Sequence, residues 1–112
     1  MSKFFQSELV RGDIQEMAKL QEFCFRSVTN LALLDKERKL QYFEALRMLL
    51  EKQKIFYTRI SLSDDEEAKS VAENMKQAVI MLGGDRNLDV RAMFDDLLQK
   101  IDAFEAHVDK HP

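Results

Sequence analysis

The stretch from Lys36 to Ser61 constrains the fold of this 112-residue chain more than any other. Projected as a helix of about 3.6 residues per turn, it carries apolar side chains over a very broad arc: Tyr42, Phe43, Ala45, Leu46, Leu49, Leu50, Phe56, Tyr57 and Ile60. A helix that docks on a single core needs an apolar face only about 100° wide. The pattern therefore predicts a long helix that packs against more than one neighbour.

Three further segments show helical periodicity, running from about Glu8 to Thr29, from Asp64 to Leu82 and from Val90 to Val108. The last is the most regular, with apolar residues at 90, 94, 97, 101, 104 and 108. Three Gly and one Pro are few for a sheet protein, which needs more turn residues. We therefore predict an all-α fold: four helices, the second the longest, in helical hairpins joined by short loops, forming a single domain over residues 1–112.

Composition limits the partners and the compartment. The net charge of −3 comes from mixed acids and bases, so it lacks the basic surplus typical of nucleic-acid binding. No apolar run approaches the roughly 18 residues of a membrane span. The start of the chain has charges where a signal peptide has its apolar core. The single Cys24 has no second cysteine to pair with inside the chain. We expect a cytoplasmic protein with no nucleic-acid partner and no membrane span.

Capping residues mark the expected helix starts. Asp35 is a candidate N-cap for the long helix. Ser63 and Glu66 have the spacing of a capping box, in which the serine oxygen accepts an amide of the next turn and the glutamate reaches back to the serine amide. The acids after Ser63 also suit the positive end of a helix dipole. We predict Ser63 and Glu66 as the cap of the third helix, and Gly83-Gly84 as its stop.

Two patterns resemble metal sites, and we interpret both otherwise. Asp85, Asn87, Asp89 and Asp96 match four positions of a calcium loop, but the required Gly and the final Glu are absent, so a polar loop capped by Asn87 or Asp89 is favoured. His107 and His111 are four residues apart but lie at the frayed chain end. Cys24 lies on an apolar face and is interpreted as a core residue. We predict no metal, no cofactor and no catalytic residue.

A narrow stripe on the long helix is the candidate interaction surface. Met48, Ile55 and Leu62 are seven residues apart, opposite much of the main apolar arc. Glu44, Glu51, Lys52 and Arg59 flank them in the helical projection. Two interpretations remain open: the first or fourth helix packs over the stripe, or the stripe contacts a second copy or a foreign helix, with the flanking charges setting the register.

Two stretches, FFQSELVRGDI and LLEKQKIFYTRISLSDDEEAK, resemble a small uncharacterised family, a domain of unknown function of cyanobacteria and of the T4-like phages that infect them. The resemblance implies a soluble helical protein and transfers no catalytic residue.

The segment KQKIFYTR mixes cations with aromatic residues, as proteins that bind single-stranded nucleic acid do. On a helix, however, its aromatic residues fall on the apolar arc, whereas Lys52 and Arg59 fall outside it. This separation indicates a core face and a solvated face.

The function predicted from these patterns is a non-enzymatic protein–protein interaction or regulatory module. Its partner is expected to be a second copy of itself, an unidentified host or phage protein, or both. The alternative is a small cofactor-free enzyme of the chorismate-mutase type, which would stabilise its transition state with arginine clamps. The candidate clamp residues are Arg11, Arg47, Arg59 and Arg91. Two or more of them buried around a cavity would favour this alternative, although Arg47 and Arg59 lie on different sides of the long helix.

Overall fold

The structure is a computed structural model that describes residues 3–81 and 89–110. Its elements are α1 (Lys3–Gln6), α2 (Glu8–Val28), the 3-10 turn η1 (Leu31–Leu33), α3 (Lys36–Leu62), α4 (Glu66–Met81) and α5 (Val90–Lys110). Among the described residues there is no strand, so the all-α prediction is confirmed. The four long helices are those that the periodicity predicts, and the short α1 and η1 are additional.

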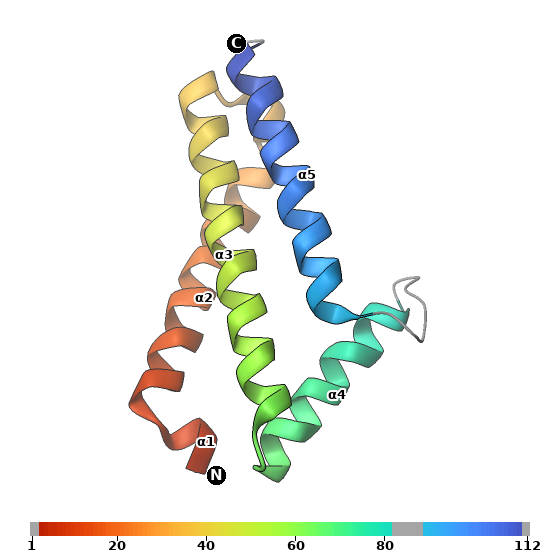
Figure 1. The fold of residues 1–112 in the computed structure, drawn as a ribbon. Coiled ribbons are helices and arrows are strands. Elements are labelled where there is room, and N and C mark those ends of the chain that lie inside the picture. Colours follow the sequence, from red (N-terminus) through yellow and green to blue (C-terminus); the bar gives the residue numbers. More distant parts are fainter. Residues whose placement is uncertain (1–2, 82–88, 111–112) are drawn as a thin grey trace.

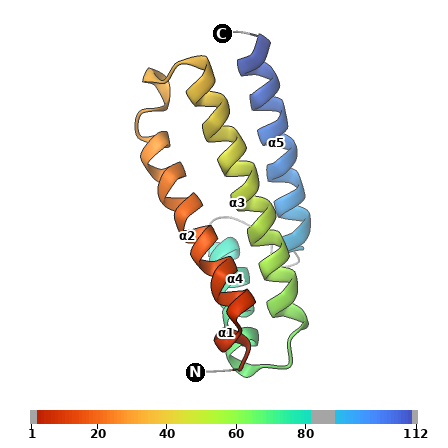
Figure 2. The same cartoon turned by 90° about the vertical axis from the view of Figure 1, so that its left-hand side faces the viewer.

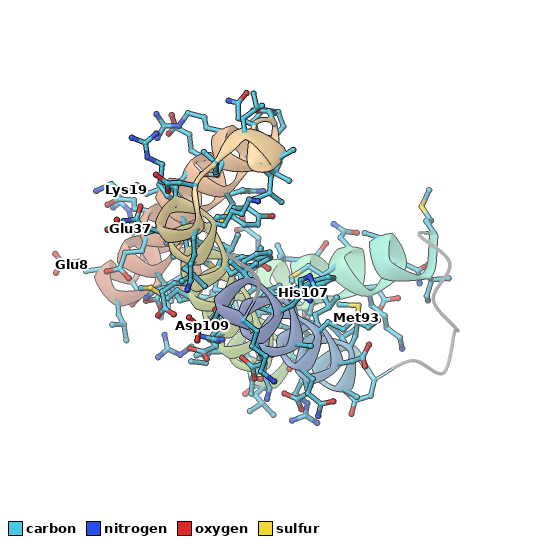
Figure 3. The ribbon with its side chains drawn as sticks, turned by 90° about the horizontal axis from the view of Figure 1, so that it is seen from above. Glu8, Lys19, Glu37, Met93, His107 and Asp109 are labelled. Atoms are coloured by element: carbon cyan, nitrogen blue, oxygen red, sulfur yellow. The ribbon has the colours of Figure 1, made fainter. Side chains whose placement is uncertain are left out.

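The long helix α3 is the centre of the molecule. Helices α2 and α5 lie along its two sides, and α4 packs against its C-terminal half (Figures 1 and 2). Seen from above, α4 projects away from the side on which Lys19 and Glu37 lie (Figure 3). The prediction that this helix contacts more than one neighbour is confirmed, since α2, α4 and α5 all pack on it.

Most of the buried side chains form two clusters on α3, and Val90 and Phe94 of α5 are buried outside both. The first joins α2, α3 and α5 and contains Cys24, Tyr42, Phe43, Ala45, Leu49 and Ile101. The second joins the N-terminal half of α2 to the end of α3 and the start of α4 and contains Val10, Phe56, Ile60 and Ala68. Ile60 and Ala68 have no exposed surface at all. The interpretation of Cys24 as a core residue is confirmed.

Some apolar residues of α2 and α5 are exposed. Ile14 and Val28 of α2 are 39% and 47% exposed, and Phe104 of α5 is 57% exposed although its ring stacks on Phe43. Each of these two helices packs mainly against α3. Because α3 alone covers only part of the apolar face of each helix, the apolar residues at the edge of that face stay exposed.

The N-cap of α3 is as predicted, but the N-cap of α4 is not. Asp35 Oδ1 accepts a hydrogen bond from the Arg38 amide at 2.9 Å. For α4, the carboxylate of Asp65 accepts from the amides of Glu67 and Ala68, at 2.9 and 3.2 Å. The predicted capping box of Ser63 and Glu66 is therefore wrong, and the cap lies two residues later.

The physical reason is that Ser63 already ends α3. Its amide donates to the Ile60 carbonyl, so Glu66 has no free Ser63 amide to reach back to. The Ser63 hydroxyl accepts instead from the Asp65 amide at 3.1 Å, within the turn that separates the two helices. Glu66 is the first residue of α4, and its side chain is 92% exposed.

The loop before α5 is described only from Asp89 onward. Asp89 Oδ1 accepts from the Arg91 amide at 3.0 Å, which confirms the helix-capping interpretation for this residue. Gly83, Gly84, Asp85 and Asn87 lie outside the described residues, as does His111. Within residues 3–81 and 89–110, no group of three His, Cys, Asp or Glu side chains is arranged to hold a metal ion. In the same ranges, no helix has the length and apolar character needed to span a bilayer.

Candidate interaction surface

The predicted stripe on α3 is exposed. Met48, Ile55 and Leu62 are 42%, 53% and 79% exposed, and none of them belongs to either buried cluster. The interpretation in which the first or fourth long helix packs over the stripe is therefore wrong for this chain. We call the side of α3 that carries these three residues the open face.

Ion pairs to α2 bound one edge of the open face. The Lys52 ammonium lies 2.6 Å from Glu16 Oε2, and Arg59 Nη1 lies 2.6 Å from Asp13 Oδ2. These two cations were expected to set the register of a partner helix. In the structure they hold α2 beside α3 instead, because α2 places a carboxylate opposite each of them.

Ion pairs to α5 bound the other edge. Arg47 Nε donates to Asp102 Oδ1 at 3.1 Å, and the same guanidinium lies 2.9 Å from Glu105 and 3.0 Å from Glu44. About two helical turns further along α3, Lys54 pairs with Asp95. The open face thus runs between two columns of interhelical ion pairs. These columns mark the two margins of the open face.

The ion pairs shift the pKa values of their members. The hydrogen bond between Lys52 and Glu16 raises the pKa of Lys52 and lowers the pKa of Glu16. For Arg47, burial disfavours the charged form, but the contacts with Glu105 and Asp102 outweigh it and raise the pKa. All three groups are therefore charged at neutral pH.

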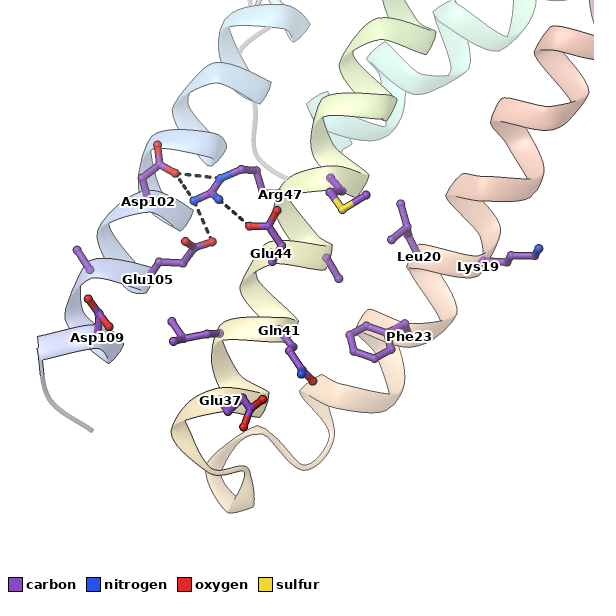
Figure 4. A pocket seen from close by; sticks show the side chains of 14 residues that line it. Lys19, Leu20, Phe23, Glu37, Gln41, Glu44, Arg47, Asp102, Glu105 and Asp109 are labelled. Carbon is purple, nitrogen blue, oxygen red and sulfur yellow. Dashed lines mark hydrogen bonds and ion pairs between the residues drawn. The ribbon is translucent and has the colours of Figure 1, made fainter.

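A groove of about 1110 Å³ opens along the N-terminal half of the open face, between α2 and α5 (Figure 4). Its apolar lining includes Leu20 and Phe23 from α2, Leu40, Ala45 and Met48 from α3, and Ala106 from α5. The Phe23 ring points from α2 toward α3 (Figure 4). The groove shares Met48 with the predicted stripe and Glu44 with the charges predicted to flank it, whereas the sequence assigned Leu20, Phe23 and the acids of α5 to no site.

Carboxylates dominate the charge of this groove, which we call the acidic groove. Five acids line it: Glu37, Glu44, Asp102, Glu105 and Asp109. The two cations in the lining are Lys19, which points away from the groove, and Arg47. Three of the carboxylates surround Arg47, so their negative charge exceeds that of the guanidinium they neutralise. The contact of Arg47 with α5 could not be predicted, because nothing in the sequence connects it to Asp102.

The arginine clamp of the enzyme alternative does not form among the described residues. Arg47 faces α5 and Arg59 faces α2. Arg91 lies near its own capping Asp89, at the start of α5. Arg11 is exposed on α2. The four arginines thus lie on different surfaces, and two of them are held by carboxylates of neighbouring helices.

The family described as "Domain of unknown function (DUF1825)" matches residues 2–108. The chain belongs to the DUF1825 family. The DUF1825 match spans both buried clusters, the open face and every residue of the acidic groove except Asp109. No curated protein and no solved structure matches the chain.

Proposed function

We propose that this chain is a non-enzymatic protein-interaction module that binds its partner through the open face of α3. The observation that carries the proposal is the exposure of Met48, Ile55 and Leu62 between the two columns of ion pairs. Single exposed apolar residues are common on protein surfaces. These three residues instead form a row about 21 Å long on one helix, at about 1.5 Å per residue, and a partner helix lying along α3 can contact all three.

The ion pairs support the same proposal. They join α3 to α2 and to α5 at the edges of the open face, so they favour this arrangement of the three helices before a partner binds. A surface that needs no reordering binds with a smaller entropic penalty. In this proposal the protein acts in the cytoplasm of a cyanobacterium, and its partner is a protein of that host or of an infecting phage.

The experiment compares two substitutions that place the same charge on an exposed apolar residue. Ile55→Glu changes the open face, whereas Phe25→Glu changes a residue of α2 that is 70% exposed and lies outside the open face and the acidic groove. Tagged wild-type and variant proteins would be used to capture partners from a cyanobacterial lysate, with mass spectrometry as the readout. Size-exclusion chromatography with light scattering would report self-association.

We expect Ile55→Glu to keep its helical circular dichroism and a cooperative melt, yet lose a partner that Phe25→Glu retains, or elute as a smaller species. Unfolding of Ile55→Glu would assign the residue to the core. An unchanged partner list and an unchanged size for Ile55→Glu would exclude the open face as the interface.

A further inference from the structure

We infer that the acidic groove binds a basic amphipathic helix of a partner protein. This inference rests on the proposed function, and it names the class of partner for the N-terminal half of the open face. The groove combines an apolar floor with a carboxylate rim, and an amphipathic helix with Lys or Arg beside its apolar face has the complementary arrangement.

The floor offers separate anchoring positions for apolar side chains. Phe23 is 38% exposed and Met48 is 42% exposed, and they enter the groove from different helices. Together with Leu20 and Leu40 they form a surface that is apolar along the groove. Flexible thioether side chains are frequent on surfaces that bind varied partners, and aromatic side chains are frequent among the residues that contribute most to binding.

The rim selects the sign of the partner's charge. Within the described part of the chain, Glu37 has no ion pair, and Glu44 shares Arg47 with Asp102 and Glu105. Asp109 contacts Lys36 at 3.5 Å, at the end of the groove. The groove therefore retains uncompensated negative charge, which attracts a cationic helix and repels anionic surfaces.

The groove also limits the length of the bound segment. Along α3 its lining extends from Glu37 to Met48, which is about 16 Å at about 1.5 Å per residue. A partner helix of roughly three turns covers this distance. Its apolar residues would follow the i, i+3, i+4, i+7 spacing of one helical face.

A second copy of this chain fits the groove less well. The chain has a net charge of −3, and the described helices α2, α4 and α5 each mix acids with bases along their exposed sides. Packing one groove against another would place two carboxylate rims together. The charges therefore favour a foreign helix.

The test uses three synthetic peptides with a fluorescent label. The first contains Leu, Lys and Ala with leucines on one helical face. The second has the same composition in an order that removes this face, and the third replaces each Lys of the first by Glu. Fluorescence anisotropy would measure their binding to the full-length protein at low and high salt.

Four variants locate the binding. Phe23→Ala and Met48→Ala reduce the floor, and Glu37→Lys reverses a rim charge. Glu73→Lys is the matched control, because it makes the same charge change on α4, outside the groove. Circular dichroism would establish that each variant is folded. If Phe23→Ala does not fold, Met48→Ala replaces it as the variant that reduces the apolar floor.

We expect the first peptide to bind and the other two to bind at least about tenfold more weakly. Phe23→Ala and Glu37→Lys should each weaken the first peptide about fivefold or more, because one removes an anchor and the other an attraction. Glu73→Lys should leave the affinity unchanged. Added salt should weaken binding to the wild type, since the rim is exposed to solvent.

Three results would overturn the inference: no binding of the first peptide, equal binding of all three peptides, or equal weakening by Glu37→Lys and Glu73→Lys. A dimer that Phe23→Ala converts to a monomer, without peptide binding, would assign the groove to a second copy. Ile55 does not line the groove, so the two proposals fail separately. If Ile55→Glu releases a partner but no peptide binds, only the partner class is wrong.

Discussion

Lys52 of α3 and Glu16 of α2 form an ion pair of 2.6 Å directly beside the exposed Ile55. The pair shows how this molecule leaves an apolar row uncovered. Helix α2 lies close enough to α3 to bury Val10, Met17 and Cys24 at least in part, but its charged edge meets Lys52 and Arg59 before it reaches the stripe. The open face thus lies between two helices whose charged edges contact α3 at its margins.

The ion pair should make stability depend on pH. Because the contact lowers the pKa of Glu16, the unfolded state binds more protons than the folded state in the acid range. The contribution of Glu16 is therefore complete above the pKa of an unperturbed Glu, near about 4.3, and is lost as the pH falls through the lowered value in the folded protein.

Urea melts of the wild type and of Glu16→Gln at neutral and acid pH would measure this effect. The difference in unfolding free energy between them should be largest at neutral pH and vanish in acid. The pKa of Lys52 is raised in the folded protein, so the contribution of Lys52 to stability is lost only as the pH rises through that raised pKa, far above the acid range of the Glu16 effect. A difference that stays constant from neutral pH to acid would contradict the role assigned to the pair.

Two isoleucines five residues apart on α3 should respond differently to truncation. Ile60 has no exposed surface, so Ile60→Ala should lower the free energy of unfolding by about 2–5 kcal/mol through lost burial and a cavity. Ile55 is 53% exposed, and Ile55→Ala should change the free energy of unfolding by at most about 0.5 kcal/mol. Urea denaturation followed by circular dichroism measures both. Equal destabilisation would show that the open face is buried in solution.

The cap of α4 can be tested at Asp65. Asp65→Ala removes the acceptor of the Glu67 and Ala68 amides and should destabilise the protein by about 1 kcal/mol. Asp65→Asn keeps an oxygen acceptor and should have a smaller effect. Ser63→Ala should also be milder, since the Ser63 hydroxyl accepts from the Asp65 amide within the turn, before α4 begins. Thermal melts in which Ser63→Ala is the most damaging of the three would restore Ser63 as the cap.

Cys24 should be unreactive in the folded protein. It is 7% exposed, and burial raises the pKa of its thiol, which lowers the fraction of reactive thiolate at neutral pH. A disulfide reagent that releases a coloured thiol should react at least about tenfold more slowly with the native protein than with the protein in urea. Rapid reaction under native conditions would mean that the packing between α2 and α3 opens readily.

The sequence by itself determined the helices and the apolar stripe. Helix formation and face assignment depend on spacing along one segment, so the broad arc around Leu49 and the seven-residue spacing of Met48, Ile55 and Leu62 are legible without coordinates. The family resemblance likewise rested on contiguous residues, and the match over residues 2–108 confirms a domain of unknown function.

The sequence pattern did not identify the N-cap of α4, because two nearby residues could both fill that position. Both Ser63 and Asp65 can cap a helix, and the choice between them depends on where α3 ends. The Ile60 carbonyl takes the Ser63 amide, and Asp65 Oδ2 also accepts from the Phe4 amide, 61 residues away in sequence. No pattern within the loop contains that contact.

Only the tertiary structure decided what covers each face of α3. The partners of Lys52, Arg59 and Arg47 lie on α2 and α5, tens of residues away, and their positions depend on how the connecting turns direct those helices. The acidic groove exists because residues from three helices meet there. Periodicity specifies which side of a helix is apolar, but burial of that side is set by packing between helices, which is a property of the whole chain.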